Sequence, residues 1–119
     1  MTAATMTIAL TDKGFDEAVI AHPQLVVDFW APWCGPCRML SPVLDDLARE
    51  QAGRVVVGKV NVDEQPALAA RFGVRSIPTL IFFKHGEAID TVVGAVPRAE
   101  ISKRIEALQD RAGSTRGGS

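Results

Sequence analysis

Cys34 and Cys37 are the only two thiols of the 119-residue chain, and two residues separate them. Thiols at this spacing can form and reopen a disulfide, with one thiolate attacking a substrate disulfide and the other resolving the mixed disulfide. A zinc half-site and two unrelated core cysteines are the alternatives. Zinc normally takes four ligands, and the two histidines, His22 and His85, do not stand at zinc-finger spacing. The pattern favours a redox dithiol and predicts no bound metal.

The elements around the cysteines indicate how they are positioned. Residues 25–31 form an almost wholly apolar run, typical of a strand that is covered on both faces. From Cys34 onward the apolar residues recur at helical spacing, with Pro36 in the first turn. Cys34 therefore stands at a helix start and nearer the loop, where the helix dipole and free backbone N–H groups favour its thiolate, and it is expected to be the exposed nucleophile. Cys37, one turn into the helix, is expected to be the more buried, resolving thiol. The expected apolar residues of this helix are Met39, Leu40, Val43, Leu44 and Leu47.

The whole chain reads as one α/β domain in which strands and helices alternate in the order β α β α β α β β α. The expected strands are residues 5–10, 25–31, 55–62, 79–83 and 88–93. The βαβ order implies parallel strands with a right-handed crossover, whereas the last two strands are close enough to form an antiparallel hairpin. The result is a mixed sheet flanked by helices.

The outer helices and the chain ends give weaker signals. Thr11 is the expected N-cap of the first helix, and Pro97 begins the last one. The expected buried face of the first helix comprises Phe15, Val19 and Ile20. Residues 113–119 contain no apolar anchor, so the domain is predicted to span residues 1–112 and to be followed by a disordered tail.

Composition and charge restrict the possible partners. Thirteen Lys and Arg against fourteen Asp and Glu give a net charge of −1, which does not favour nucleic acid or an anionic membrane surface as a partner. No apolar stretch approaches the roughly 20 residues of a membrane-spanning helix. The N-terminal residues lack the basic and apolar regions of a secretory signal. The cytoplasm is the expected compartment, where a lone CxxC is more often catalytic or metal-binding than a structural disulfide.

Three polar or rigid residues interrupt otherwise apolar runs. Asp28 lies within the run 25–31, where burial would raise its pKa, although a strand with one wet face would leave it in solvent. Lys59 interrupts the next strand in the same way, and a surface lysine with a buried stem is the alternative. Pro78 directly precedes a strand, where either a cis peptide or an ordinary trans turn would explain it.

Four segments, each in its expected order and place, make the chain resemble the thioredoxin family from about residue 7 to residue 108. These segments are VDFWAPWCGPC (27–37), GKVNVD (58–63), FGVRSIPTL (72–80) and VGA (93–95). The resemblance implies the thioredoxin fold, with a central mixed sheet of about five strands and about four flanking helices. Arg38 and Ser76 depart from residues common in the family, and neither departure affects the dithiol.

The resemblance also implies roles for residues outside the dithiol. Asp28 would lie beneath the CxxC motif as the proton acceptor for Cys37, acting through water, and Lys59 would lie beside Asp28. Pro78 would follow a cis peptide bond and pack against the cysteines, while Gly35 and Pro36 would support the active site. The implied client-binding surface comprises Trp33, Ile77, Pro78, Val93, Gly94 and Ala95.

A protein-disulfide reductase is the function that these features favour. The Gly35-Pro36 spacer places no imidazole beside Cys34, and weaker stabilisation of the reduced form makes a better reductant. The family further implies a monomer that binds disulfide-containing client proteins, holds no cofactor beyond the Cys34–Cys37 disulfide, and is re-reduced by an NADPH-dependent thioredoxin reductase. The alternatives from other classes are a disulfide oxidase or isomerase and a binding module whose cysteines are incidental.

Overall fold

The computed structural model describes the backbone of residues 7–114 and the side chains of residues 7–109. Its strands and helices follow the order expected from the sequence. The strands are β1 (Thr7–Ala9), β2 (Gln24–Trp30), β3 (Val56–Asn61), β4 (Thr79–Lys84) and β5 (Glu87–Val93). The helices are α1 (Phe15–Ala21), α2 (Gly35–Glu50), α3 (Pro66–Arg71) and α4 (Arg98–Ser114). None of the helices in this part of the chain is long and apolar enough to cross a membrane.

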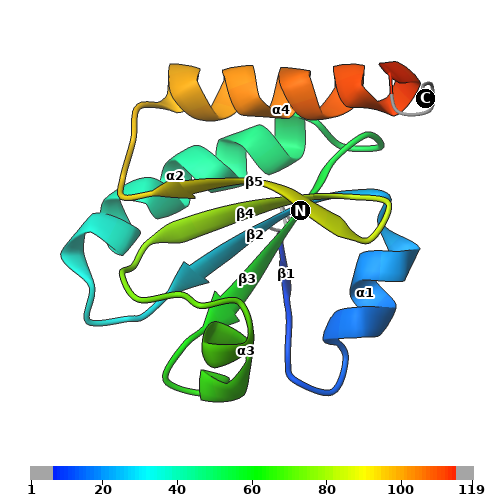
Figure 1. Ribbon diagram of the computed structural model, residues 1–119. Helices are drawn as coiled ribbons and strands as arrows, with labels where there is room; N and C mark the ends of the chain where they lie inside the picture. The colour runs from blue at the N-terminus through cyan, green and yellow to red at the C-terminus, as the bar shows by residue number, and fades with distance from the viewer. Residues whose placement is uncertain (1–6, 115–119) are drawn as a thin grey trace, which may run out of the picture.

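The strands form one mixed sheet in the order β1-β3-β2-β4-β5. Strand β3 pairs in parallel with both β1 and β2, whereas β4 pairs antiparallel with β2 and β5. Helices α2 and α4 cover one face of this sheet, and α1 and α3 cover the other (Figure 1). Because β2 lies in the middle and is covered on both sides, the almost wholly apolar composition of residues 25–31 follows directly.

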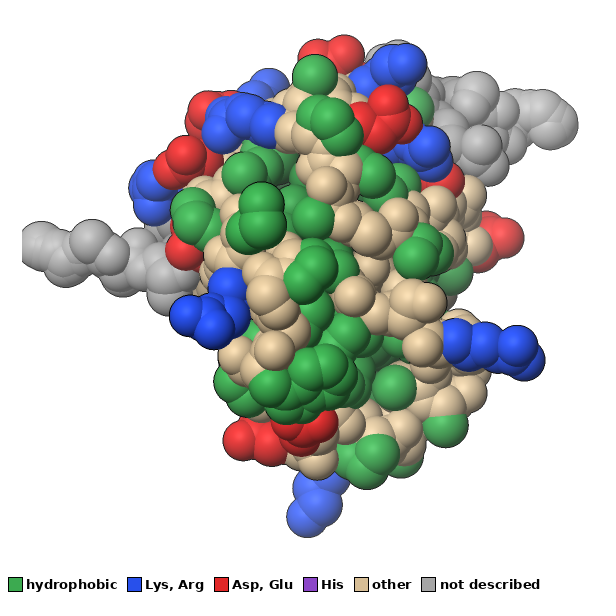
Figure 2. All heavy atoms as spheres, turned by 90° about the vertical axis from the view of Figure 1, so that its left-hand side faces the viewer, with side chains coloured by type: hydrophobic (Ala, Val, Ile, Leu, Met, Phe, Trp, Pro, Cys, Tyr) green, Lys and Arg blue, Asp and Glu red, His purple; other side chains and the backbone are tan. Residues whose placement is uncertain are grey.

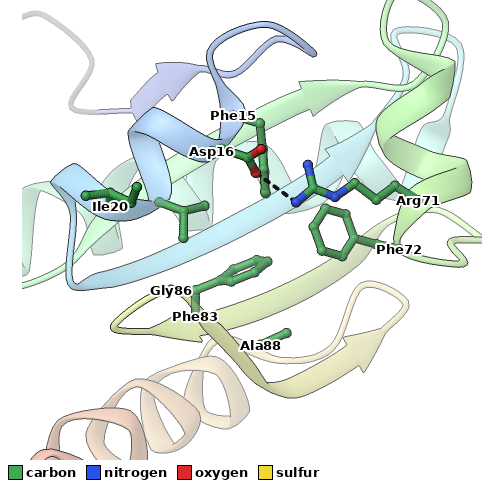
Figure 3. A pocket seen from close by; sticks show the side chains of 9 residues that line it. Phe15, Asp16, Ile20, Arg71, Phe72, Phe83, Gly86 and Ala88 are labelled. Atoms are coloured by element: carbon green, nitrogen blue, oxygen red, sulfur yellow. Dashed lines mark hydrogen bonds and ion pairs between the residues drawn. The ribbon is translucent and has the colours of Figure 1, made fainter.

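The two faces of the sheet bury different side chains. Successive residues of a strand point to opposite faces, so Val27 and Phe29 pack with α1 and α3, while Val26 and Asp28 point toward α2. On the α1 side, four phenylalanine rings meet in tilted and edge-to-face pairs with centroids 5.1–6.1 Å apart. This phenylalanine cluster comprises Phe15, Phe29, Phe72 and Phe83. Figure 3 shows three of its rings beside a hollow, with the Arg71 guanidinium over Phe15 and Phe72.

Two apolar residues that the periodicity assigned to the core lie in solvent instead. Ile20 is 80% exposed and Met39 is 74% exposed, so both assignments were wrong. In α1 the buried pair is Phe15 and Val19, four residues apart, and Ile20 is turned about 100° past Val19. In α2 the buried residues also recur at three- and four-residue steps, and Met39 falls between two of them. These buried residues are Cys37, Leu40, Leu44, Leu47 and Ala48.

The ends of some helices and strands also differ from those predicted from the sequence. The N-cap of α1 is Gly14, not Thr11; the Thr11 hydroxyl instead accepts a hydrogen bond from the Gly14 N–H at 3.2 Å, which forms a turn before the helix. Helix α4 ends at Ser114, two residues beyond the predicted domain end at residue 112. Residues 5 and 6 of the first predicted strand and residues 115–119 lie outside the described residues.

The predicted hairpin is present with a tighter connection. Lys84 pairs with Glu87, which leaves His85 and Gly86 as a two-residue loop. Both loop residues have positive φ, 49° and 85°, as the tightest hairpin turns require. The strands therefore extend further into the connection than the composition of residues 84–87 suggested.

Candidate functional site

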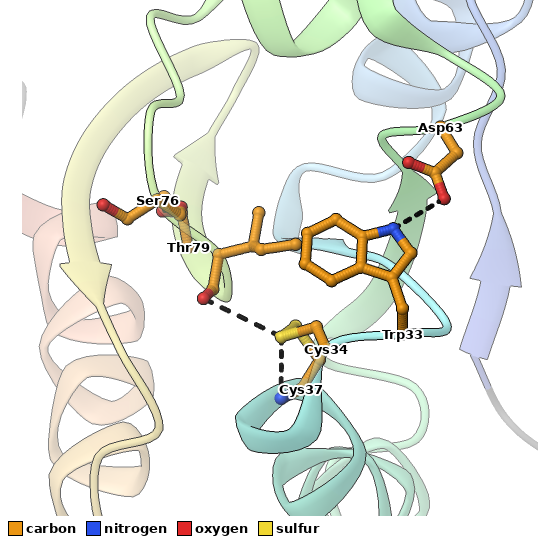
Figure 4. The surroundings of a disulfide bond; sticks show 7 residues. Trp33, Cys34, Cys37, Asp63, Ser76 and Thr79 are labelled. Carbon is orange, nitrogen blue, oxygen red and sulfur yellow. Dashed lines mark hydrogen bonds between the residues drawn. A yellow bond between two sulfur atoms is a disulfide. The ribbon is translucent and has the colours of Figure 1, made fainter.

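The two cysteines form a disulfide at the N-terminus of α2, with their Cα atoms 5.3 Å apart. Cys34 is the N-cap residue, with extended backbone angles, and its own N–H donates to the Ala31 carbonyl oxygen at 3.2 Å. The Cys34 Sγ accepts a hydrogen bond from the Cys37 N–H at 3.2 Å (Figure 4). The helix therefore offers Cys34 a backbone donor and the positive end of its dipole, as the sequence indicated.

Both sulfur-bearing residues are covered in the oxidised state. Cys34 is 5% exposed and Cys37 is 2% exposed, so the expected order of exposure is present, but Cys34 is not the openly exposed residue that the sequence indicated. The cover comes from apolar neighbours that include Ala31 and the half-buried Ile77. The Cys34 Sγ lies 3.8 Å from the Ile77 carbonyl oxygen; because a disulfide sulfur carries no hydrogen, this is a van der Waals contact.

The loop that carries Ile77 lies directly against Cys34. The Ile77–Pro78 peptide bond is cis, as the resemblance implied. The Thr79 hydroxyl donates to the Ser76 carbonyl oxygen at 2.6 Å, and the Gly94 N–H donates to the Pro78 carbonyl oxygen at 2.8 Å. These two bonds fix the loop at both ends and join it to the segment that follows β5.

An apolar surface surrounds the disulfide. Trp33 is 67% exposed and Val93 is 59% exposed, Ile77 and Gly94 are half-buried, and Ala95 is exposed. Figure 2 shows this end of the molecule, where α2 begins and β5 ends, with hydrophobic side chains through the centre and most charged side chains toward the edge. The structure therefore brings five of the six predicted surface residues to one end of the molecule, whereas the sixth, Pro78, is buried.

Asp63 lies at the site and was not among the residues predicted from the sequence to have a role there. The indole N–H of Trp33 donates to the Asp63 Oδ2 at 2.9 Å, which joins the loop before α2 to the loop after β3 (Figure 4). The sequence signal that could have indicated its role was its place after a predicted strand. Asp63 follows the carboxyl end of β3, next to the β2 end from which the CxxC loop departs, and functional side chains of parallel sheets gather at that edge.

The spacer residues Gly35 and Pro36 are both exposed at the first turn of α2. Apart from its two chain neighbours and the nearby backbone of its own helix, no heavy atom lies within 4 Å of the position that a Cβ of Gly35 would occupy. The spacer therefore leaves the space beside Cys34 open. Pro36 has no N–H to leave unpaired in this turn.

Asp28 is buried beneath α2, with an exposed fraction of 1%. Burial raises the pKa of its carboxyl from 3.8 to about 7, and the positive charge of Lys59 offsets part of that rise. Its Oδ1 has no hydrogen-bond partner among the described side and main chains. The alternative of a solvent-facing aspartate is therefore wrong, and a buried acid with one unpaired oxygen lies in the layer that also contains Cys37.

Lys59 is the register partner of Asp28 on the adjacent strand. Its Nζ donates to the Ser41 Oγ at 2.9 Å and lies 5.6 Å from the ring centroid of Trp30. None of the ion pairs found between described side chains joins Lys59 to Asp28 within 4.0 Å, so the charge acts on the carboxyl across space. Ser41 had no role in the sequence analysis; a serine within an otherwise ordinary helix was the only signal.

A sequence profile of the thioredoxin family matches residues 6–107, most of the chain. The chain belongs to the thioredoxin family. It is 52% identical over 98 residues to the M-type chloroplastic thioredoxin of Pisum sativum, a match that covers 82% of this chain and 57% of the pea protein. It is 50% identical over 98 residues to thioredoxin 1 of a Nostoc species and 48% identical over 101 residues to a thioredoxin of a Synechocystis species. These matches cover 92% and 94% of the cyanobacterial proteins.

Family membership and the Cys34–Cys37 disulfide together make this chain a thiol–disulfide oxidoreductase. The fold agrees, since over residues 7–114 the sheet has five strands and four helices flank it, as the thioredoxin resemblance implied. No group of three or more His, Cys, Asp or Glu side chains within the described part of the molecule is placed to hold a metal ion. The relatives include chloroplast and cyanobacterial proteins, so they do not define one compartment for the family.

Proposed function

We propose that this thioredoxin-family protein reduces disulfide bonds of client proteins, with Cys34 as the nucleophile and Cys37 as the resolving thiol. The position of Cys34 as the N-cap of α2, with its Sγ accepting the Cys37 N–H, is the observation that carries this assignment. In the reduced protein the same donor and the helix dipole stabilise a thiolate at Cys34. Cys37 lies inside the first turn of α2 and is not the N-cap residue, so its thiolate is expected to be less stabilised than that of Cys34.

The reaction has two exchange steps. The Cys34 thiolate attacks one sulfur of the client disulfide; a Cys34–client bond forms, the client disulfide breaks, and its second sulfur takes a proton from water. Cys37 then loses its proton and attacks the Cys34 Sγ. The Cys34–Cys37 disulfide forms and the first client sulfur leaves as a thiolate. Two electrons pass from the dithiol to the client, and the structure with its closed disulfide corresponds to the product state.

Asp28 is the proposed acceptor for the Cys37 proton, acting through water, with Lys59 tuning its charge. A pKa of about 7 leaves a substantial fraction of the carboxyl ionised at neutral pH, so it can accept a proton and later release it. An aspartate with an ordinary pKa would be a weaker base by three orders of magnitude. The unpartnered Oδ1 supports the role, because that oxygen is free to accept a bond from water.

Client proteins are proposed to dock on the apolar surface around the disulfide. Trp33, Ile77 and Val93 supply apolar area, and Gly94 and Ala95 add little bulk near the sulfur atoms. Pro78 is buried and is proposed to support this surface rather than to contact the client. Few charges lie at the centre of this surface, so recognition depends on shape and backbone groups (Figure 2). Such a surface suits extended segments of many sequences. Gly35 and Pro36 support it by leaving the approach to Cys34 open.

The electron source is proposed to be an NADPH-dependent thioredoxin reductase, which membership of the thioredoxin family supports. The chain is proposed to act as a monomer in a reducing compartment, the cytoplasm, with the Cys34–Cys37 disulfide as its only redox group. The absence of an imidazole in the Gly35-Pro36 spacer supports the reducing direction.

A mixed-disulfide trap tests the division of roles. In Cys37→Ser the first exchange step proceeds and the second cannot, so incubation with a disulfide-bonded client is expected to accumulate a covalent complex. The matched Cys34→Ser variant is expected to form none and to lose client reduction by at least about a thousandfold. A covalent complex with Cys34→Ser but not with Cys37→Ser would contradict the assignment.

The reducing direction has its own test. Equilibration of the Cys34–Cys37 pair against glutathione is expected to place it among reducing couples. A strongly oxidising couple would contradict the proposal and support the oxidase or isomerase alternative. A Cys34→Ser, Cys37→Ser double variant that restores function to cells lacking the protein would support the binding-module alternative instead.

A further inference from the structure

Ser41 makes a contact that the helix does not require. It lies in α2 four residues after Cys37, half-buried on the side that faces the sheet. Serine is a weaker helix former than alanine, and a serine inside a helix commonly bonds the carbonyl four residues earlier. Here the Ser41 Oγ instead accepts a hydrogen bond from the Lys59 Nζ at 2.9 Å. The hydroxyl therefore links the redox helix to the strand next to Asp28.

The position of the Lys59 ammonium determines its effect on Asp28. The two residues are register partners on neighbouring parallel strands, and no hydrogen bond or ion pair between described groups joins their side chains. Because no hydrogen bond holds the two groups together, their electrostatic attraction falls as the distance between them increases. The groups that hold the ammonium in place are the Ser41 hydroxyl and the face of Trp30, whose centroid is 5.6 Å from Nζ.

A second place for the ammonium exists on the outer side. A hollow of about 470 Å³ is lined by Lys59 together with Trp30, Asn61 and Glu64. A lysine stem is long and flexible, so an ammonium released from Ser41 can move into this hollow toward water and the Glu64 carboxylate. Movement of the ammonium into this hollow would take positive charge away from the buried Asp28.

We propose that Ser41 is a positioning residue for the proton-transfer step, whose hydroxyl holds the Lys59 ammonium on the inner side of the hollow, next to Asp28. This inference rests on the proposed role of Asp28 as proton acceptor. Ser41 touches neither sulfur atom in any recorded contact; it acts through Lys59. Without its hydroxyl the Asp28 carboxylate loses part of its favourable charge partner and binds its proton more tightly.

The groups that face Asp28 limit what else changes its titration. Lys59 faces it from β3, and the residue paired with it on β4 is Leu80, which carries no charge. Cys37 is the titratable group that α2 places in the same layer. In the oxidised protein Cys37 cannot titrate, so the Asp28 titration is free of coupling to a thiol and reports the effect of Lys59.

The test is the titration of the Asp28 carboxyl carbon, followed by NMR in the oxidised protein, for the parent chain and four variants. Ser41→Ala is expected to raise the pKa of Asp28 by about half a unit or more, a threefold tighter hold on the proton. Ser41→Thr keeps a hydroxyl and is expected to restore the parent value. In a Lys59→Met background, adding Ser41→Ala is expected to change nothing further, because the route through Lys59 is already removed.

Three results would overturn the inference: an unchanged or lower Asp28 pKa in Ser41→Ala, no restoration in Ser41→Thr, or an equal Ser41→Ala shift with and without Lys59. Each leaves the proposed function standing, because the titration is measured without client turnover. The proposed role of Asp28 is tested separately, by whether Asp28→Asn slows the release of client from the mixed disulfide. The two proposals therefore fail on different measurements.

Discussion

The two faces of the central sheet differ in the kinds of side chain that they bury. On the α1 side, β2 contributes Val27 and Phe29 to the core around the phenylalanine cluster, and none of the described charged side chains is fully buried there. On the α2 side, the intervening positions of the same strand are Val26 and Asp28, and Asp28 is as deeply buried as its apolar neighbours. One strand therefore supplies apolar side chains alone to one face and a buried acid to the other.

This difference separates residues that stabilise the fold from residues that serve the chemistry. A buried carboxyl without a hydrogen-bond partner on Oδ1 lowers stability when it is ionised, and no packing argument explains its presence. It lies in the layer beneath the helix that begins at the disulfide. We expect substitutions on the phenylalanine side to change stability alone, and substitutions on the Asp28 side to change stability and chemistry in opposite directions.

The largest effect is expected from Phe15→Ala. Phe15 is 1% exposed and contacts the rings of Phe72 and Phe83, so its truncation leaves a cavity and should lower the free energy of unfolding by about 3–5 kcal/mol. Urea unfolding measures this change. The rate of client reduction per folded molecule is expected to stay at the parent value.

The control for Phe15→Ala is Ile20→Ala on the same helix. Ile20 is 80% exposed, and its truncation is expected to change stability by no more than about 0.5 kcal/mol. A loss of client reduction in folded Phe15→Ala protein would show that the two faces are not independent.

Asp28→Asn is expected to raise the free energy of unfolding rather than lower it. The native pKa of about 7 lies above the ordinary value of 3.8, so the folded protein binds more protons than the unfolded chain between these pH values. The contribution of Asp28 to stability is therefore full below about pH 4, is lost as the pH rises to 7, and is constant above that. The neutral amide avoids this loss, so Asp28→Asn should exceed the parent stability by about 2–4 kcal/mol at pH 8.

Urea unfolding of the variant and the parent at pH 4, 6 and 8 measures the sign of the stability difference and the pH range over which it develops. The gain in stability of the variant should disappear by pH 4. Resolution of the mixed disulfide should be slower in the same variant, because the proton acceptor is missing. A variant that is less stable than the parent at pH 8, or one with unchanged resolution, would remove the contrast between the two faces.

Gly58→Ala is expected to have a smaller effect, confined to stability. Gly58 lies on β3 next to Lys59 but points to the opposite face, where a Cβ would stand 2.4 Å from the Leu10 Cδ1. Leu10 must shift to admit it, at a cost of about 1–3 kcal/mol. The Asp28 titration should be unchanged. A shifted Asp28 pKa in this variant would mean that crowding on one face is transmitted to the other.

The sequence predicted the fold well because its signals are local and strong. The apolar run 25–31, the glycine-containing hairpin connection and the change of period at Cys34 each depend on neighbouring residues, and the order of elements follows from them. Ile20 and Met39 were placed wrongly because an apolar residue beside a buried stripe fits helical spacing almost as well as a member of it.

The site was only partly predictable for a different reason. Cys34, Cys37 and Asp28 stand out as residue types in unusual places, and the resemblance to a family supplied roles for others. The contacts of Asp63 with Trp33 and of Ser41 with Lys59 join residues 30 and 18 positions apart. Neither pair has a spacing that a local pattern can reveal, so the sheet register and helix packing had to be known first.

Partial alkylation of the fully reduced protein measures directly whether Cys34 is the more reactive thiol. A limiting amount of iodoacetamide at pH 7, followed by mass spectrometry of the peptides, measures which cysteine reacts first. We expect Cys34 to be labelled at least roughly tenfold faster than Cys37, because the helix N-terminus stabilises its thiolate. Faster labelling of Cys37, or slow labelling of both, would contradict this expectation.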